Sequence, residues 1–141
     1  MARLEELENY EGEIERVEQE AEEANEQLED VNNRLNQLES AIGQLSEDQE
    51  VAESLESNKE AAESERGQIE GRRNELAEQL GKMEEELGEM TEENEQSASV
   101  LSQLESAGED VGDAQNIVNQ RKGQIQEYQN RIRFLMDSLR Q

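Results

Sequence analysis

The chain has 141 residues and a formal net charge of −25, and 31% of its residues are hydrophobic against 36% charged. This composition excludes a wide globular core, and the absence of proline favours long uninterrupted helices. Cysteine and histidine are absent, which excludes disulfides, thiol nucleophiles, Cys/His zinc sites and the commonest general base.

The start of the chain, MARLEELENY, has no apolar stretch, and no run of about 18 apolar residues follows. The sequence therefore predicts neither a signal peptide nor a membrane span. We expect a cytoplasmic location by default, with leaderless export as the alternative. Residues 1–105 contain 33 acidic and 8 basic residues, whereas residues 106–141 contain 5 of each. This negative field disfavours nucleic acid and favours a basic protein as partner.

Heptad spacing predicts a first helix over residues 2–45. Its apolar positions alternate three and four residues apart, as in a coiled coil. The two rows are Leu7, Ile14, Ala21, Leu28, Leu35, Ile42 and Tyr10, Val17, Ala24, Val31, Leu38, Leu45. Ser46 with Gln49 then resembles a capping box that opens the next helix.

A second helix is predicted over residues 47–105, because the same spacing continues. Its rows are Leu55, Ala62, Ile69, Leu76, Met83, Met90, Ser97, Leu104 and Ala52, Lys59, Arg66, Arg73, Leu80, Leu87, Asn94, Leu101. The cluster SAGEDVGD then indicates a turn, with Gly108 as C-cap and Asp110 or Asp113 as the next N-cap.

A third helix is predicted over residues 110–140. Its rows are Val111, Val118, Ile125, Ile132, Leu139 and Ala114, Arg121, Tyr128, Leu135. Short connections make neighbouring helices antiparallel. Both rows of the first pair match when Leu28 faces Ile69, and those of the second pair when Leu87 faces Tyr128. Asn94 then faces Arg121 in a polar layer.

These registers predict an all-α fold, an antiparallel coiled coil in one elongated helical domain over residues 1–141. We expect a three-helix stem formed by residues of about 1–24, 73–105 and 108–141. The remaining residues, about 25–72, should protrude as a two-helix hairpin.

Three cations, Lys59, Arg66 and Arg73, occupy core positions of the expected hairpin. We interpret them mainly as packing residues whose stems cover apolar neighbours and whose heads reach Glu residues in a half-open seam. The alternative is a docking stripe for an acidic partner segment.

The third predicted helix, residues 110–140, is the best candidate for a partner surface. It is neutral, and it carries more apolar residues than one core row requires. The candidates there are Ile117, Tyr128, Phe134 and Met136. A second candidate is the end of the stem, where Val100 and Leu101 should stay partly uncovered. Self-association through helix 3 is a further prediction.

The C-terminal stretch GEDVGDAQNIVNQRKGQIQEYQNRIRFLMDSL resembles the last helices of small bacterial proteins that accompany LXG or WXG100-type cargo in type VII secretion. The resemblance covers about the last quarter of the chain, without the Trp-x-Gly turn of that family. It implies a non-enzymatic helper that binds a helical toxin domain.

The sequence predicts no catalytic, cofactor or metal site, since no calcium loop, phosphate-binding loop or nucleophile–base arrangement is present. Our first hypothesis is a coiled-coil binding or scaffold protein that presents helical surfaces to a helical or basic protein partner. The alternatives are a helper for a type VII secreted toxin, a holdase-like chaperone and a phage scaffolding protein.

Overall fold

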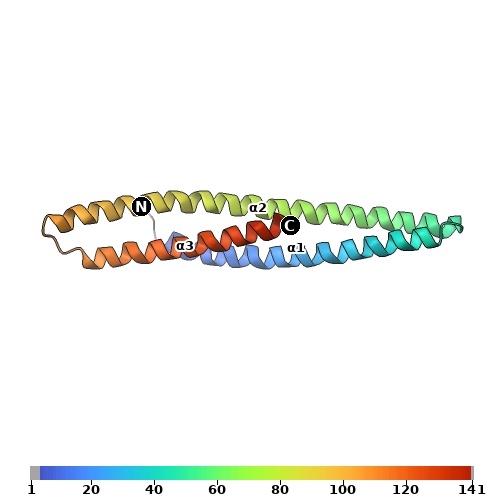
Figure 1. The fold of residues 1–141 in the computed structure, drawn as a ribbon, viewed down its shortest axis with the longest axis horizontal. Helices are drawn as coiled ribbons and strands as arrows, with labels where there is room; N and C mark the ends of the chain where they lie inside the picture. Colours follow the sequence, from blue (N-terminus) through green and yellow to red (C-terminus); the bar gives the residue numbers. More distant parts are fainter. Residues whose placement is uncertain (1–3, 141) are drawn as a thin grey trace. The chain divides into compact units, whose positions relative to one another are not determined.

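The computed structural model describes residues 4–140, which form three helices joined by short turns (Figure 1). Helix α1 spans Leu4–Gln44, α2 spans Gln49–Ser106 and α3 spans Gly112–Arg140. The all-α prediction is confirmed, and no strand occurs within the described residues. Each predicted boundary lies within about two residues of the observed one, although residues 2 and 3 of the predicted first helix lie outside the described part.

Contacts divide the described residues into two compact units. Unit 1 comprises the described residues of Met1–Glu18 and Ala77–Gln141, and unit 2 comprises Gln19–Leu76. Helices α1 and α2 each contribute to both units, whereas α3 belongs to unit 1. Unit 1 includes α1 as far as Glu18, whereas the predicted stem extended to about residue 24.

Unit 1 is a three-helix arrangement, since its polar bonds join all three pairs of helices. Tyr10 of α1 donates a hydrogen bond to Glu86 of α2, and Arg131 of α3 donates to Glu18 of α1 at 3.0 Å. Asn94 of α2 donates to the Val118 carbonyl of α3 at 3.0 Å. The core beneath holds Leu7, Ile14, Leu80, Leu87, Ile125 and Ile132, each 2% exposed or less.

Unit 2 is an antiparallel pair formed by α1 and α2. Its buried cluster contains Ala24, Val31, Leu35, Ala62 and Ile69, with Leu28 and Leu38 packed against it. Ion pairs run along the flanks of the pair. They join Glu23 to Arg72, Arg34 to Glu65, and Glu39 to Lys59.

These pairs agree with the predicted register of α1 against α2. The register places Arg34 opposite Glu63 and Glu39 opposite Asn58, and each observed partner lies one or two residues away. A flanking side chain normally reaches a neighbour of its direct counterpart, so offsets of this size are expected.

The turns show one confirmed cap and one wrong one. Gly108 adopts φ 93° and closes α2 in a Schellman motif, with Glu109 donating to the Leu104 carbonyl at 3.0 Å. The predicted Ser46 cap is wrong: Asp48 accepts from the Val51 amide at 3.3 Å, while Ser46 donates back to the Gly43 carbonyl. Both Ser46 and Asp48 have side chains that can cap a helix. Asp48 is the cap because it directly precedes Gln49, the first residue of α2.

Candidate protein-binding surfaces

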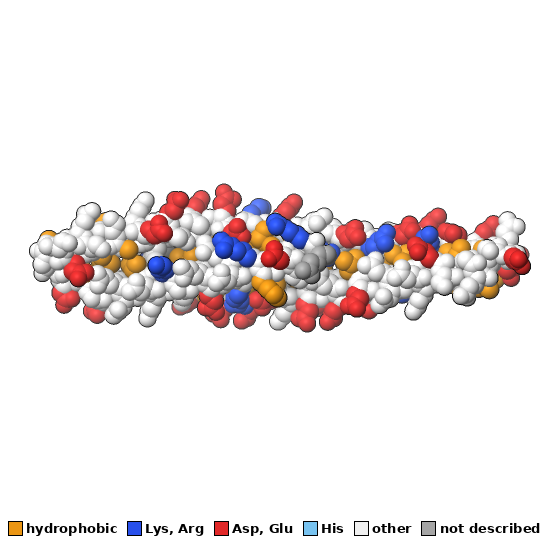
Figure 2. Space-filling view, viewed as in Figure 1, with side chains coloured by type: hydrophobic (Ala, Val, Ile, Leu, Met, Phe, Trp, Pro, Cys, Tyr) orange, Lys and Arg blue, Asp and Glu red, His pale blue; other side chains and the backbone are white. Residues whose placement is uncertain are grey.

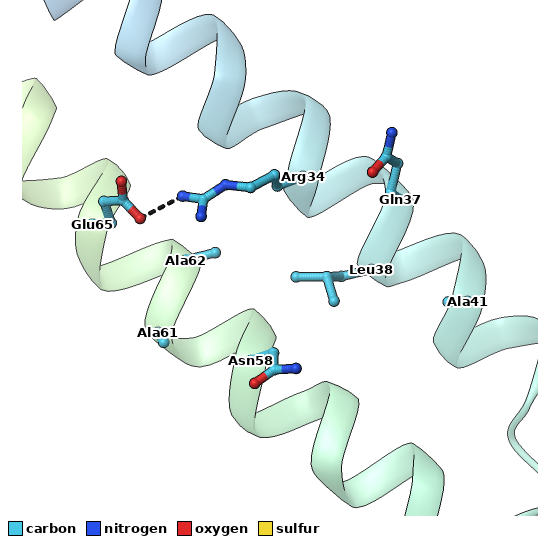
Figure 3. A pocket seen from close by; sticks show the side chains of 8 residues that line it. All are labelled: Arg34, Gln37, Leu38, Ala41, Asn58, Ala61, Ala62 and Glu65. Carbon is cyan, nitrogen blue, oxygen red and sulfur yellow. Dashed lines mark hydrogen bonds and ion pairs between the residues drawn. The ribbon is translucent and has the colours of Figure 1, made fainter.

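A hollow in unit 2 forms a groove between α1 and α2, which we call the hairpin groove. Its volume is about 540 Å³. It is lined by Arg34, Gln37, Leu38, Ala41, Asn58, Ala61, Ala62 and Glu65 (Figure 3). In Figure 3, Leu38 points from α1 toward α2, and Arg34 reaches across to Glu65. The groove therefore has an apolar floor, with an ion pair spanning the two helices on one side.

Small side chains create the hairpin groove. Ala41, Ala61 and Ala62 stop at Cβ, so the helices leave space that longer side chains would fill. A second hollow of about 480 Å³ shares Arg34, Gln37 and Glu65 with the groove and adds Gln27, Asp30 and Asn33 to its lining. The uncovered strip thus continues along α1 on the same flank.

The surroundings of the hairpin groove are acidic. Unit 2 contains 17 acidic and 5 basic residues, which gives it a net charge of −12. Figure 2 shows acidic side chains distributed widely over the face in view, with fewer basic ones. A ligand with basic groups around an apolar stripe would complement both features of the groove.

The three cations Lys59, Arg66 and Arg73 form a basic stripe along α2. This stripe is more enclosed than predicted at one end. Lys59 lies 3.8 Å from Glu39, with its side chain 27% exposed, as expected for a seam half open to water. Arg66 is also partly exposed. Arg73, however, is only 8% exposed, which corrects the expectation of a half-open position there. In the predicted register it faces Ala24, whose small side chain leaves room for the Arg73 stem.

The residues predicted as a partner surface occupy different environments. Phe134 is 74% exposed, Val100 54% and Ile117 43%, whereas Leu101 and Met136 are partly buried. Tyr128 is 4% exposed and belongs to the core of unit 1, so it is not available as a surface residue. Its place in a heptad row, opposite Leu87, explains the correction.

A buried polar residue, Asn94, joins α2 to α3. Asn94 is 5% exposed and bonds Val118 rather than Arg121, the predicted counterpart. Its Oδ1, the Arg121 Nε and the Gln124 Oε1 are buried without hydrogen-bond partners. Asn94 also lines a cavity of about 200 Å³. The heptad rows predict a polar layer at Asn94 and Arg121. They do not indicate Gln124, which lies outside both rows of the third helix.

Both tyrosines have a raised pKa. Burial is the main cause at Tyr10, and the Glu86 carboxylate that accepts its hydrogen bond adds to it. Burial also raises the pKa of Tyr128, followed by the negative charge of Glu11. In both cases burial favours the neutral phenol over the charged phenolate.

Within residues 4–140, no group of three or more carboxylates is arranged to hold a metal ion. Nor does any helix of this range combine the length and apolarity that crossing a bilayer requires.

Comparison with known proteins found no matching family model, no similar curated protein and no similar solved structure. The resemblance of the C-terminal quarter to type VII secretion partners stays a prediction.

Sequence reasoning missed the hairpin groove, although a signal for it exists. Ala41 and Ala61 lie beside the core rows, at positions where a coiled coil usually carries long charged side chains. Alanine at such flanking positions, on both helices and on one side, marks a place where the seam between the two helices is left open.

Proposed function

We propose that the protein is a non-enzymatic scaffold that binds a helix of a protein partner in the hairpin groove. The observation that carries this proposal is the groove itself, an apolar floor left open between two helices of an acidic hairpin. A helix binds such a groove through apolar residues repeated every three or four positions.

The charge of unit 2 supports a basic partner. Its 12 excess negative charges would attract a helix whose apolar stripe is flanked by Lys or Arg, and would repel one flanked by Glu. Gln37 and Asn58 add neutral hydrogen-bonding groups at the groove. Binding should weaken as salt screens the attraction.

The test uses two synthetic helical peptides with the same Leu/Ala heptad stripe, one flanked by Lys and the other by Glu. We expect the full-length protein to bind the Lys-flanked peptide at least ten times more tightly, as measured by fluorescence anisotropy. Equal affinity for the two peptides would refute the charge argument.

A matched pair of variants locates the binding. Ala61→Leu fills the groove with a good helix former, and we expect it to weaken the Lys-flanked peptide about tenfold or more. Ser64→Leu adds the same side chain at an exposed position outside the groove lining and should leave affinity unchanged. If both variants bind like the wild type, the peptide does not occupy the groove.

A further inference from the structure

The end of unit 1 formed by the last turns of α2 and the first turns of α3 exposes apolar side chains. Val100 is 54% exposed, Leu104 42% and Ile117 43%. Two hydrogen bonds hold these segments side by side: Gln115 donates to Glu105 at 2.7 Å, and Asn94 donates to Val118. We call residues 96–104 and 114–120 the neutral end surface.

The name reflects the lack of charged residues within these two segments. Residues 96–104 read QSASVLSQL and residues 114–120 read AQNIVNQ, without a single Asp, Glu, Lys or Arg. In the whole chain, 36% of residues are charged. In Figure 2, hydrophobic side chains are visible toward this end, at the left of the view.

The exposure follows from the register of α1. In the predicted register, Leu4, the first described residue of α1, lies opposite Glu93 of α2. The segments 95–106 and 112–120 consequently pack on each other without a described α1 residue beside them. Elsewhere in unit 1, α1 covers the corresponding positions, and Leu7, Leu87 and Ile125 are buried there. The neutral end surface therefore presents apolar positions that a third helix covers further along the bundle.

The lack of charge in the neutral end surface indicates that its partner is a second copy of the chain. Across a two-fold axis each patch meets its own copy, so a surface carrying one sign of charge repels itself. Between two chains that each carry a net charge of −25, repulsion is weakest where the facing segments themselves carry no charge, and the neutral end surface meets that condition. Its Ser, Gln and Asn side chains each both donate and accept hydrogen bonds, so identical groups can pair across the axis.

We propose that two copies of the chain associate through the neutral end surface, with Val100, Leu104 and Ile117 at the centre of a two-fold interface. The patch comprises only about four helical turns per copy. The dimer therefore belongs to the small, weak class of interfaces, with a Kd on the order of 1–100 µM.

Sedimentation equilibrium of the full-length chain from about 1 to 500 µM tests the proposal. The average mass should rise from one chain toward two, and the dimer should strengthen in high salt because screening reduces repulsion between the acidic copies. A monomer at every concentration and salt level would overturn the proposal and would leave the patch to a different protein.

Two substitutions on α3 localise the interface. Ile117→Glu places a charge in the patch and should weaken the dimer at least tenfold, with the circular dichroism spectrum unchanged. Phe134→Glu makes the same change at the most exposed apolar residue of α3, outside the patch, and should leave the dimer intact. Loss of the dimer in Phe134→Glu alone would place the interface elsewhere.

Cross-linking traps the dimer covalently and provides a second readout. Because the chain has no cysteine, Ile117→Cys introduces a single thiol. We expect oxidation to yield a disulfide-linked dimer with Ile117→Cys and much less with the matched variant Phe134→Cys. Equal yields from the two variants would contradict the two-fold arrangement.

Discussion

Replacing Asn94 by leucine should stabilise the protein. Asn94 occupies a core position between α2 and α3, where it is 5% exposed, and its Oδ1 has no hydrogen-bond partner. Its Nδ2 donates to the Val118 carbonyl at 3.0 Å. Val118 lies inside α3, so this carbonyl keeps its helical hydrogen bond when the side chain is removed.

The magnitude follows from three effects. Removing the unsatisfied Oδ1 recovers roughly 1–3 kcal/mol, and losing the Nδ2 bond costs about 0.5–1.5 kcal/mol. Burying a leucine side chain contributes roughly 1.5–3 kcal/mol, reduced by whatever repacking the site requires. The adjoining cavity of about 200 Å³ gives space to the two methyl groups, which are larger than the Oδ1 and Nδ2 they replace. We expect a net gain of about 1–3 kcal/mol in the free energy of unfolding.

Thermal and urea unfolding followed by circular dichroism measure this gain. For a chain of this size, about 3 °C per kcal/mol converts the expected gain into a rise in Tm of about 3–9 °C. Asn94→Ala is the matched variant: it removes the same polar atoms but enlarges the cavity, so it should not match the leucine variant.

A fall in Tm for Asn94→Leu, with unchanged helicity and urea m-value, would refute the reasoning. Such a result would mean that the Oδ1 is satisfied by ordered water in the cavity, so that the asparagine stabilises the pairing of α2 with α3. A stable variant with a changed oligomeric state would instead identify Asn94 as a register-fixing residue.

Three further predictions concern stability. Gly71→Ala should add about 1 kcal/mol, because a Cβ there meets nothing within 4 Å, whereas Gly108→Ala should destabilise, because its φ of 93° suits glycine; urea unfolding compares the two. Sodium chloride should raise the Tm between about 10 and 500 mM by screening the net charge of −25, and a Tm independent of salt would contradict this. Folding raises the pKa of Tyr10 and Tyr128, so the folded state holds these protons more tightly. Stability should therefore be complete below about pH 10 and fall above it, by up to about 1.4 kcal/mol per pH unit for each tyrosine, and a spectrophotometric titration at 295 nm should show both phenols ionising later than in urea.

The sequence predicted the helices and their pairing well, because both depend on a repeated pattern rather than on single residues. Heptad rows fix which face of a helix is apolar, and matching two rows at once fixes the register. The pairing of Arg34 with Glu65 follows from this, since both flank the predicted seam on one side. One glycine, Gly108, was enough to place the end of α2.

The parts that the sequence did not predict depend on the details of individual side chains. Asn94 has two polar ends, and a heptad position does not determine which of several nearby groups each end will meet. Arg73 is buried because of the size of the residue opposite, and Tyr128 because the core accepts the whole ring. The hairpin groove likewise arises from the absence of side-chain atoms at Ala41 and Ala61, whereas a search for functional residues looks for atoms that are present.

The same excess of negative charge acts in opposite directions on the two proposed surfaces. At the hairpin groove it attracts a basic helix, so salt should weaken that complex. At the neutral end surface it opposes the approach of a second acidic copy, so salt should strengthen the dimer. A salt series that follows peptide binding and dimerisation on one sample therefore separates the two proposals. If both respond in the same direction, charge does not select the partner at one of the two surfaces.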